Sequence, residues 1–254
     1  MKKTTFNKST LGHLLISAKE QFLLFFNKSL LSSLQLETSS FLFKTRQSII
    51  LVFFFLAFFS ANAATIYVNS ATGSDVNAGT VGSPYKTFHK AYTMAAASGD
   101  VINLTGTFDW TAVDETGDGA TSGYTISKNL TIQGQGANST TMQAANADNI
   151  ADRRIFTINY GYTVSINNCT IRYGKTTDGG GIQVDGIATI ESCDISYNRA
   201  TGASGGGLNC RGKATINNSF VSYNFAWNMG GGVNRNYYSG NGGTPGASDV
   251  LVIT

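Results

Sequence analysis

The chain has 254 residues, of which 29 are glycine, 2 are proline and 13% are charged. Globular domains usually carry about 25% charged residues, so this composition indicates a protein whose turns are built from small and amide residues. The net charge of +3 arises from residues 1–63, where seven Lys and Arg oppose two Glu, whereas residues 64–254 carry 11 Lys and Arg against 13 Asp and Glu. A nearly neutral body lacks the basic surface that a nucleic-acid partner needs, and we expect no such partner.

Residues 1–63 are predicted to be a leader that ends in a secretory signal peptide. An apolar run over 49–59 follows Lys44 and Arg46 and precedes Ala61-Asn62-Ala63, with cleavage expected before Ala64. The alternative, a membrane anchor, needs about 20 apolar residues, which is more than this run provides. We therefore expect a secreted or cell-surface protein, associated with the outer membrane. Its only membrane contact would be the signal peptide or a module beyond the C-terminal end of this sequence.

Residues 64–106 are predicted to form an N-terminal cap. A strand over 65–68 precedes a loop rich in Gly, Asn and Ser, and apolar residues at helical spacing predict a helix over 88–97 with Thr87 as its N-cap. A further strand is expected over 101–104. A helix laid over the first coil of a repeat protein would close its open end.

Residues 107–158 contain short alternating segments separated by loops. We expect a loop insertion over 107–123, strands over 124–126 and 130–132, a second excursion over 140–154 and a strand over 155–158. Strands this short, with one buried face each, are typical of coiled β architectures.

The chain then repeats itself at a fixed interval. A glycine run followed by an aliphatic residue occurs at 179–182, 205–208 and 230–233, in steps of 26 and 25 residues. Such a period signals a solenoid, yet the leucine-rich pattern is missing and helical repeats are longer. Three short strands with glycine and asparagine turns fill one lap of about 25 residues. We predict an all-β parallel β-helix solenoid with an N-terminal capping α-helix.

Stacked coils should place like residues in ladders about 4.8 Å apart. Three ladders are expected to be apolar and to point inward, one to be aromatic and one to consist of amides. Their members are Ile166, Ile190 and Ile216; Ile171, Ile195 and Val221; Ile182, Leu208 and Val233; Tyr173, Tyr197 and Tyr223; and Asn198 with Asn224. The glycine runs are expected where the backbone needs a positive φ or where two coils approach closely.

The C-terminal end follows the same pattern. Residues 250–254 resemble 214–216 and come after a loop over 240–249. Since the sequence stops within a coil and shows no capping unit, we expect residues 107–254 to be β-helix coils that are incomplete at the C-terminus, as in a fragment of a longer protein.

Three cysteines follow the leader. Cys169 and Cys193 hold the same place in successive coils, and Cys210 holds the place of Val184. Export would permit disulfides, but in-register neighbours on parallel strands give awkward Cβ geometry. We expect buried thiols that fill the core, and no metal site.

Few residues have the character of a catalytic group. His89 is expected to be structural. We identify no histidine that could serve as the base for a serine or cysteine nucleophile. The acidic stretch 114–119 offers oxygen ligands for Ca²⁺ but lacks EF-hand spacing, so a solvated loop is the favoured interpretation and Ca²⁺ the weaker alternative. Asp194 and Arg172 are predicted to occupy different ladder places. We name no catalytic residue and predict no cofactor.

Several stretches carry a resemblance to known families: 67–68, 73–75, 77–80, 83–88 and 98–102. They resemble the opening of secreted bacterial right-handed parallel β-helix proteins of the pectate-lyase-like superfamily. The Gly-Gly-aliphatic units resemble the repeats of chlamydial polymorphic outer-membrane proteins, as do 195–198 and 221–224, in which an aliphatic residue replaces the Phe of Phe-x-x-Asn. The resemblance implies a right-handed β-helix. It also implies that enzymes of this fold act as uronate lyases with Ca²⁺ and an Arg or Lys base, or as hydrolases with clustered Asp.

The outward positions are rich in Asn, Ser, Thr, Tyr and Gln. We predict a possible glycan or partner surface at Tyr173, Tyr197, Tyr223, Asn198 and Asn224, with structural packing of the tyrosines as the equal alternative. The expected function is an exported cell-surface repeat protein with a structural, adhesive or glycan-contacting role, whose partner is a polysaccharide or a host or cell-surface molecule. The alternatives are a polysaccharide lyase or glycoside hydrolase whose active coils lie beyond residue 254, and a carbohydrate-binding module.

Overall fold

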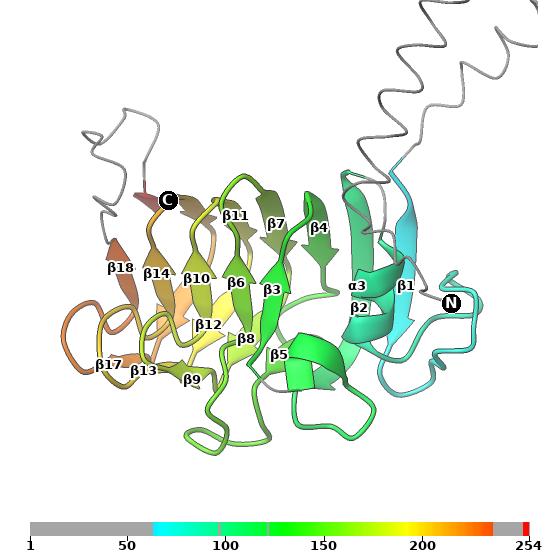
Figure 1. Cartoon of the computed structure of the whole chain (residues 1–254). Helices are drawn as coiled ribbons and strands as arrows, with labels where there is room; N and C mark the ends of the chain where they lie inside the picture. The colour runs from blue at the N-terminus through cyan, green and yellow to red at the C-terminus, as the bar shows by residue number, and fades with distance from the viewer. Residues whose placement is uncertain (1–62, 96–97, 121, 236–250, 254) are drawn as a thin grey trace, which may run out of the picture. The chain divides into compact units, whose positions relative to one another are not determined.

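A computed structural model describes residues 63–95, 98–120, 122–235 and 251–253. The predicted leader and signal peptide and the loop over 240–249 lie outside the described residues. The described part is mostly β, with strands that run parallel in long sheets (Figure 1). One short helix and one 3₁₀ turn complete it.

The N-terminal portion holds two paired strands and the helix. β1 (Thr65–Asn69) lies parallel to β2 (Asp100–Asp109), and α3 (Phe88–Met94) contacts both strands. As predicted, Thr87 is the N-cap, and its hydroxyl accepts a hydrogen bond from the Lys90 backbone N–H at 3.0 Å. The buried face of the helix carries Phe88 and Ala91.

Eighteen further short segments follow in a regular order. They are η1 (Gly117–Ala120), β3 (Tyr124–Ile126), β4 (Leu130–Gln133), β5 (Thr140–Gln143), β6 (Phe156–Ile158), β7 (Thr163–Asn167), β8 (Thr170–Arg172), β9 (Lys175–Thr176), β10 (Ile182–Val184), β11 (Ile187–Glu191), β12 (Asp194–Ser196), β13 (Arg199–Ala200), β14 (Leu208–Cys210), β15 (Lys213–Asn217), β16 (Phe220–Ser222), β17 (Phe225–Ala226), β18 (Val233–Arg235) and β19 (Leu251–Ile253).

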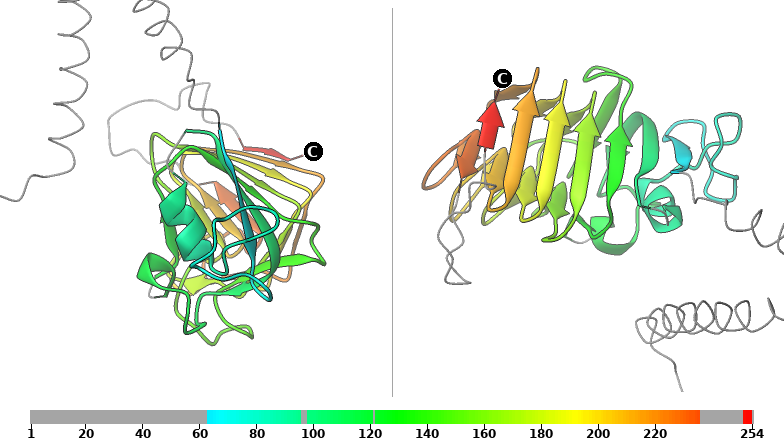
Figure 2. Two further views of the ribbon diagram at one scale, coloured as in Figure 1. Left: turned by 90° about the vertical axis from the view of Figure 1, so that its right-hand side faces the viewer. Right: turned by 90° about the horizontal axis from the view of Figure 1, so that it is seen from above.

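Each lap of the chain adds one strand to each of several parallel ladders. Neighbours run β4-β7-β11-β15-β19 in one ladder, β5-β8-β12-β16 in a second, β9-β13-β17 in a third and β3-β6-β10-β14-β18 in a fourth. β2 joins the first two, because its start pairs with β4 and its end with β5. Viewed along the stack, the strands surround a central core (Figure 2). This curled, all-parallel arrangement fits a parallel β-helix.

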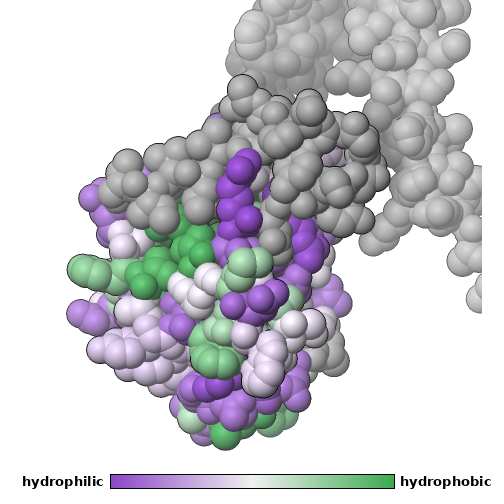
Figure 3. Space-filling model, turned by 90° about the vertical axis from the view of Figure 1, so that its left-hand side faces the viewer, coloured by the Kyte–Doolittle hydropathy of each residue, from purple (hydrophilic) through white to green (hydrophobic). Residues whose placement is uncertain are grey.

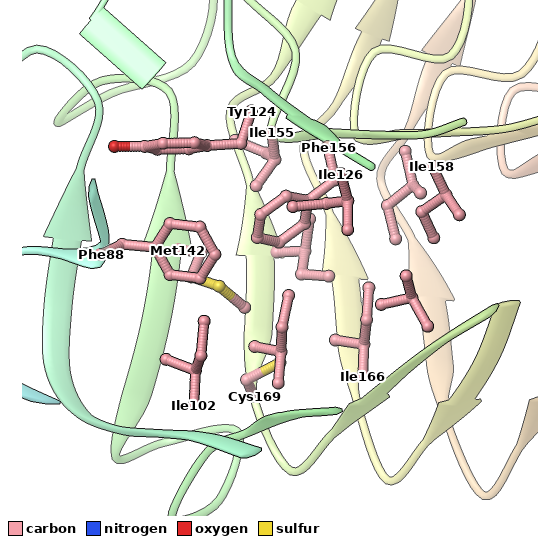
Figure 4. Packing of buried hydrophobic residues seen from close by; sticks show 14 of the residues in the cluster. Phe88, Ile102, Tyr124, Ile126, Met142, Ile155, Phe156, Ile158, Ile166 and Cys169 are labelled. Atoms are coloured by element: carbon pink, nitrogen blue, oxygen red, sulfur yellow. The ribbon is translucent and has the colours of Figure 1, made fainter. Parts of the chain in front are cut away.

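The predicted ladders are confirmed in register. Ile190 aligns with Ile166 and Ile216, Ile195 with Ile171 and Val221, and Leu208 with Ile182 and Val233. Their isoleucine and leucine members are at most 1% exposed and belong to one continuous core (Figure 4). Burying one such side chain contributes about 1.5–3 kcal/mol, so the repeated apolar ladders stabilise the stack.

Three corners of each lap adopt a left-handed backbone, again in register. Gly179, Gly205 and Gly230 form one series, with φ of 57°, 71° and 62°. The next glycine of each run allows close approach, since a Cβ on Gly180 would lie 2.4 Å from the Arg199 carbonyl oxygen. Both reasons expected for the glycine runs are therefore found, at successive positions of the run.

Several boundaries differ from the predictions. The helix ends at Met94 rather than 97, and β2 continues through residues 105–109, where a loop was expected from 107. β5 lies inside the predicted excursion 140–154 and pairs with both β2 and β8. β19 aligns Leu251 with Ala214, as the resemblance of 250–254 to 214–216 indicated.

Candidate functional site

A column of three tyrosines lies along one corner of the stack. We call Tyr173, Tyr197 and Tyr223 the tyrosine column. The ring centroids of Tyr173 and Tyr197 are 6.0 Å apart and tilted by 54°, and those of Tyr197 and Tyr223 are 5.0 Å apart and nearly parallel at 8°. Tyr197 is 42% exposed and Tyr223 is 76% exposed. The predicted aromatic ladder is therefore present and reaches the surface.

The backbone at these tyrosines is unusual. Their φ angles are 64°, 54° and 53°, in the left-handed region that bulky residues rarely adopt. Three successive coils nevertheless place a tyrosine at this position, although the left-handed backbone is unfavourable for it. The parallel rings of Tyr197 and Tyr223 cover one another's faces, so along the column a ligand meets ring edges rather than faces. The Arg172 guanidinium lies 4.7 Å from the Tyr173 ring centroid and covers the other end of the column.

The predicted amide ladder lies beneath the tyrosines and is structural in character. Asn198 is 1% exposed, and its Nδ2 donates to the carbonyl oxygens of Ile171 and Ser196, both at 3.0 Å. Its Oδ1 accepts from the Gly174 N–H at 2.9 Å, and the Asn224 Oδ1 accepts from Asn198 Nδ2 at 3.1 Å. Because Asn198 is buried, the prediction that it contacts a glycan is corrected: it holds the corner from within. Asn224 is partly exposed.

A cluster of charged side chains was not foreseen as a unit. Asp178 binds Arg154 at 3.1 Å and Arg211 at 2.5 Å, and Arg211 also lies 3.8 Å from Asp185. Burial lowers the pKa of Arg154, and the Asp178 charge opposes that effect. Two acids and two guanidinium groups neutralise each other here, so the cluster holds no free carboxylate pair.

Buried amides line the base of that cluster. The Gln183 Oε1 accepts from Asn209 Nδ2 at 3.0 Å, and the Asn209 Oδ1 accepts from Asn234 Nδ2 at 2.9 Å. Gln183 and Asn209 are 2% and 0% exposed. The shared offset of these residues after each glycine run is visible in the sequence and signals this second amide ladder.

Most of the acidic stretch 114–119 is exposed, as the solvated-loop interpretation predicts, but Glu115 within it is buried. Glu115 is 4% exposed, and its carboxylate accepts from the backbone N–H of Phe88 at 2.7 Å and from Tyr124 Oη at 2.6 Å. Asp114 instead forms an ion pair with Lys86 at 2.7 Å. Burial raises the pKa of Glu115, and both burial and the Glu115 charge raise the pKa of Tyr124. Both Glu115 oxygens therefore accept hydrogen bonds, one from the start of α3 and the other from α3 and Tyr124.

The structure also places the other residues that the sequence singled out. His89 lies in α3 with its ring 6.4 Å from that of Tyr124. Asp194 aligns with Thr170 and Arg172 with Ser196, so these two residues occupy different ladder places, as predicted. The side chains of Cys169, Cys193 and Cys210 are buried, as predicted, and Cys210 aligns with Val184. Within the described residues, no three His, Cys, Asp or Glu side chains gather as a metal site.

The last described coil replaces polar outward residues by aromatic ones. Phe220 aligns with Asp194 and Phe225 with Arg199, and they are 77% and 44% exposed. Trp227, whose backbone N–H donates to the Ala200 carbonyl, is 75% exposed. We call Phe220, Tyr223, Phe225 and Trp227 the terminal aromatic patch, and Figure 3 shows hydrophobic side chains gathered on the end of the molecule that they occupy. Aligning the repeats by register would have identified the patch.

The chain has no detectable relative among the proteins compared: no protein-family model, no curated protein and no solved structure matches it. Among the described residues, helices of sufficient length and apolar character to traverse a bilayer are not found.

Proposed function

We propose that this chain is an exported, right-handed parallel β-helix of the pectate-lyase-like type that serves at the cell surface as a rigid structural or adhesive element. It contacts a polysaccharide or a surface partner through the tyrosine column and the terminal aromatic patch. β1 and α3 cap the N-terminal end of its stack, and the predicted signal peptide directs its export.

The observation that carries the proposal is the series of exposed aromatic side chains along the outer corners of a regular stack, among them Tyr197, Tyr223 and Trp227. Aromatic side chains are enriched where proteins bind partners, because they bury a large area with few rotatable bonds. Asp194 and Arg199 show that the fold accepts charged residues at the positions of Phe220 and Phe225. The coil itself therefore does not require aromatic residues at these two positions. We attribute them to the binding of a partner.

The test is incubation of the purified protein with acidic and neutral polysaccharides, with Ca²⁺ or with a chelator. Both cleavage of the polymer and retention on insoluble polymer are measured. We expect retention without cleavage, lost in Trp227→Ala and kept in Tyr160→Ala. Tyr160 is a matched control because it is 87% exposed but lies outside both aromatic surfaces. Cleavage, or retention that is indifferent to Trp227, would contradict the proposal.

The charged cluster supports a second candidate function, a polysaccharide lyase or glycoside hydrolase. Asp178, Asp185 and Arg211 converge on one outer surface, which resembles the residue types that such enzymes use. If this second function holds, the polysaccharide panel should show cleavage that Asp178→Asn abolishes while the protein stays folded.

A further inference from the structure

Two buried thiols meet between successive coils. Cys169 and Cys193 each follow a corner residue with positive φ, Asn168 and Ser192, and the strands after them run in register. Their Sγ atoms are 3.7 Å apart, and the two residues are 0% and 1% exposed. Figure 4 shows Cys169 within the apolar core. No other pair of thiols is close in the described residues, since Cys210 aligns with Val184 and Arg235.

We propose that Cys169 and Cys193 are an oxidation site at which a disulfide forms and joins one coil to the next. The reaction is a thiol–disulfide exchange with a small disulfide such as oxidised glutathione. One protein thiolate attacks that disulfide, forms a mixed disulfide and releases one thiol. The second protein thiolate then attacks the protein sulfur of the mixed disulfide and releases the second thiol, so two protein thiols are oxidised and one disulfide is reduced to two thiols.

The position of the two cysteines makes a disulfide between them sterically feasible. Neighbouring parallel strands lie about 4.8 Å apart, within the Cα separation of about 4.4–6.8 Å that disulfides adopt, although their Cβ atoms must approach slightly. Both cysteines lie beside corners, just before β8 and β12, rather than inside those strands. Rotation of the two side chains can therefore bring the sulfur atoms together with a small adjustment of the corners.

The surroundings make oxidation slow rather than impossible. The Cys193 Sγ lies 3.4 Å from the Ile166 carbonyl oxygen and 3.3 Å from that of Glu191. The hydrogen bond with Cys193 and burial raise the pKa of Cys169, which keeps its thiolate fraction low near neutral pH. Exchange should therefore accelerate when the pH rises or when mild denaturant opens the coils.

The experiment is a time course of the purified protein with oxidised glutathione at pH 8.5, with and without a low concentration of urea. Free thiols are alkylated after denaturation, and the disulfide is located by peptide mapping under non-reducing conditions. We expect one disulfide, between the Cys169 and Cys193 peptides, that dithiothreitol reverses, and a shift of the urea midpoint to higher concentration. Cys210 is expected to remain alkylatable.

Two variants serve as controls. Cys210→Ser should form the same disulfide, whereas Cys193→Ser should form none. Serine is tolerated at this place in the next coil, where Ser219 occupies it and its Oγ accepts from the Cys193 N–H at 3.0 Å. Thiols that all remain free under these conditions, or a disulfide that involves Cys210, would overturn the proposal.

Discussion

At the scale of single residues, the tyrosine column combines an unfavourable left-handed backbone with favourable contacts between aromatic rings. A left-handed backbone at a residue with a side chain costs roughly 1–2 kcal/mol, and aromatic pairs contribute about 0.5–1.5 kcal/mol each beyond their buried area. Tyr197 contacts a ring on both sides, so its gain is of the same size as its cost. The column can therefore stabilise its corner and still leave ring edges and hydroxyl groups for a partner.

The first prediction concerns the middle of this column. Tyr197→Ala keeps the left-handed backbone but removes both ring contacts, so we expect a loss of about 1–2 kcal/mol in the free energy of unfolding. Urea denaturation followed by circular dichroism measures it. Tyr160→Ala, at an exposed residue outside the column, should change stability by less than about 0.5 kcal/mol. Equal effects of the two substitutions would show that the stacking has no energetic role.

The second prediction concerns the buried amide beneath the column. Asn198→Ala leaves the Ile171 and Ser196 carbonyl oxygens and the Gly174 N–H without this partner. An unpaired buried group costs about 1–3 kcal/mol, so a loss of about 2–4 kcal/mol is expected in urea denaturation. Asn228→Ala, at an exposed residue, is the control and should be nearly neutral. A mild effect at Asn198 would mean that water replaces the amide.

The third prediction concerns pH and Glu115. Burial raises the pKa of this carboxyl above its ordinary value of 4.5, so the folded chain binds more protons than the unfolded chain above pH 4.5. Stability from this group is complete below pH 4.5 and is lost as pH rises through the folded pKa. Lys86 lowers the pKa of Asp114, whose effect has the opposite sign and falls below pH 3.8.

Urea denaturation from pH 4.5 to 8, compared between the natural protein and Glu115→Gln, isolates the contribution of Glu115 to the pH dependence of stability. We expect the stability of the natural protein to fall with rising pH relative to Glu115→Gln. Parallel curves would show that Glu115 has the same pKa in both states.

At the scale of elements, the glycine turns decide how closely coils can stack. The fourth prediction is that Gly180→Ala destabilises by about 1–3 kcal/mol, because the added Cβ would lie 2.4 Å from a backbone carbonyl that cannot rotate away. Gly82→Ala is the matched control, since nothing lies within 4 Å of its Cβ position. Thermal unfolding of both variants measures the difference, and similar melting temperatures would contradict this role of the turn.

Much of the element order could be predicted from the sequence, because stacking requires like residues at one fixed interval. The strands of the three clear repeats, their register and the N-cap at Thr87 follow from that interval and from local rules. The sequence did not indicate β5, because Thr140–Gln143 precedes the clear repeats and pairs with residues 34 and 29 positions away, which does not match the interval of about 25. The helix ends early at Met94, although the apolar spacing continues.

The candidate site was predictable only where it repeats. The tyrosine column recurs in three successive coils, whereas the contacts of Asp178 with Arg154 and Arg211 span 24 and 33 residues without any repeat. Glu115 was placed in a solvated loop because nothing local reveals that Phe88 and Tyr124 supply its hydrogen bonds. Loops that fold back onto the stack are set by tertiary contacts, which a short window of sequence does not contain.

At the scale of the whole molecule, the described coils form a nearly one-dimensional structure. Each coil contacts mainly the coil before it and the coil after it, so stability is close to a sum over coils and their interfaces. The inward ladders supply the apolar burial, and the amide ladders satisfy backbone groups at the corners. A stack of this kind gives a rigid surface along which side chains recur at regular spacing.

The central claim is that laps of about 25 residues stack in parallel and in register. Nitroxide labels on Thr189→Cys with Thr215→Cys test it directly, because these residues are register partners on β11 and β15. The three native thiols are buried and should not react. The account predicts strong dipolar broadening for this pair, which is one strand spacing of about 4.8 Å apart at the backbone, and weaker broadening for Thr131 with Thr215, three spacings apart. A spectrum of the first pair that equals the sum of its single labels would contradict the stacking.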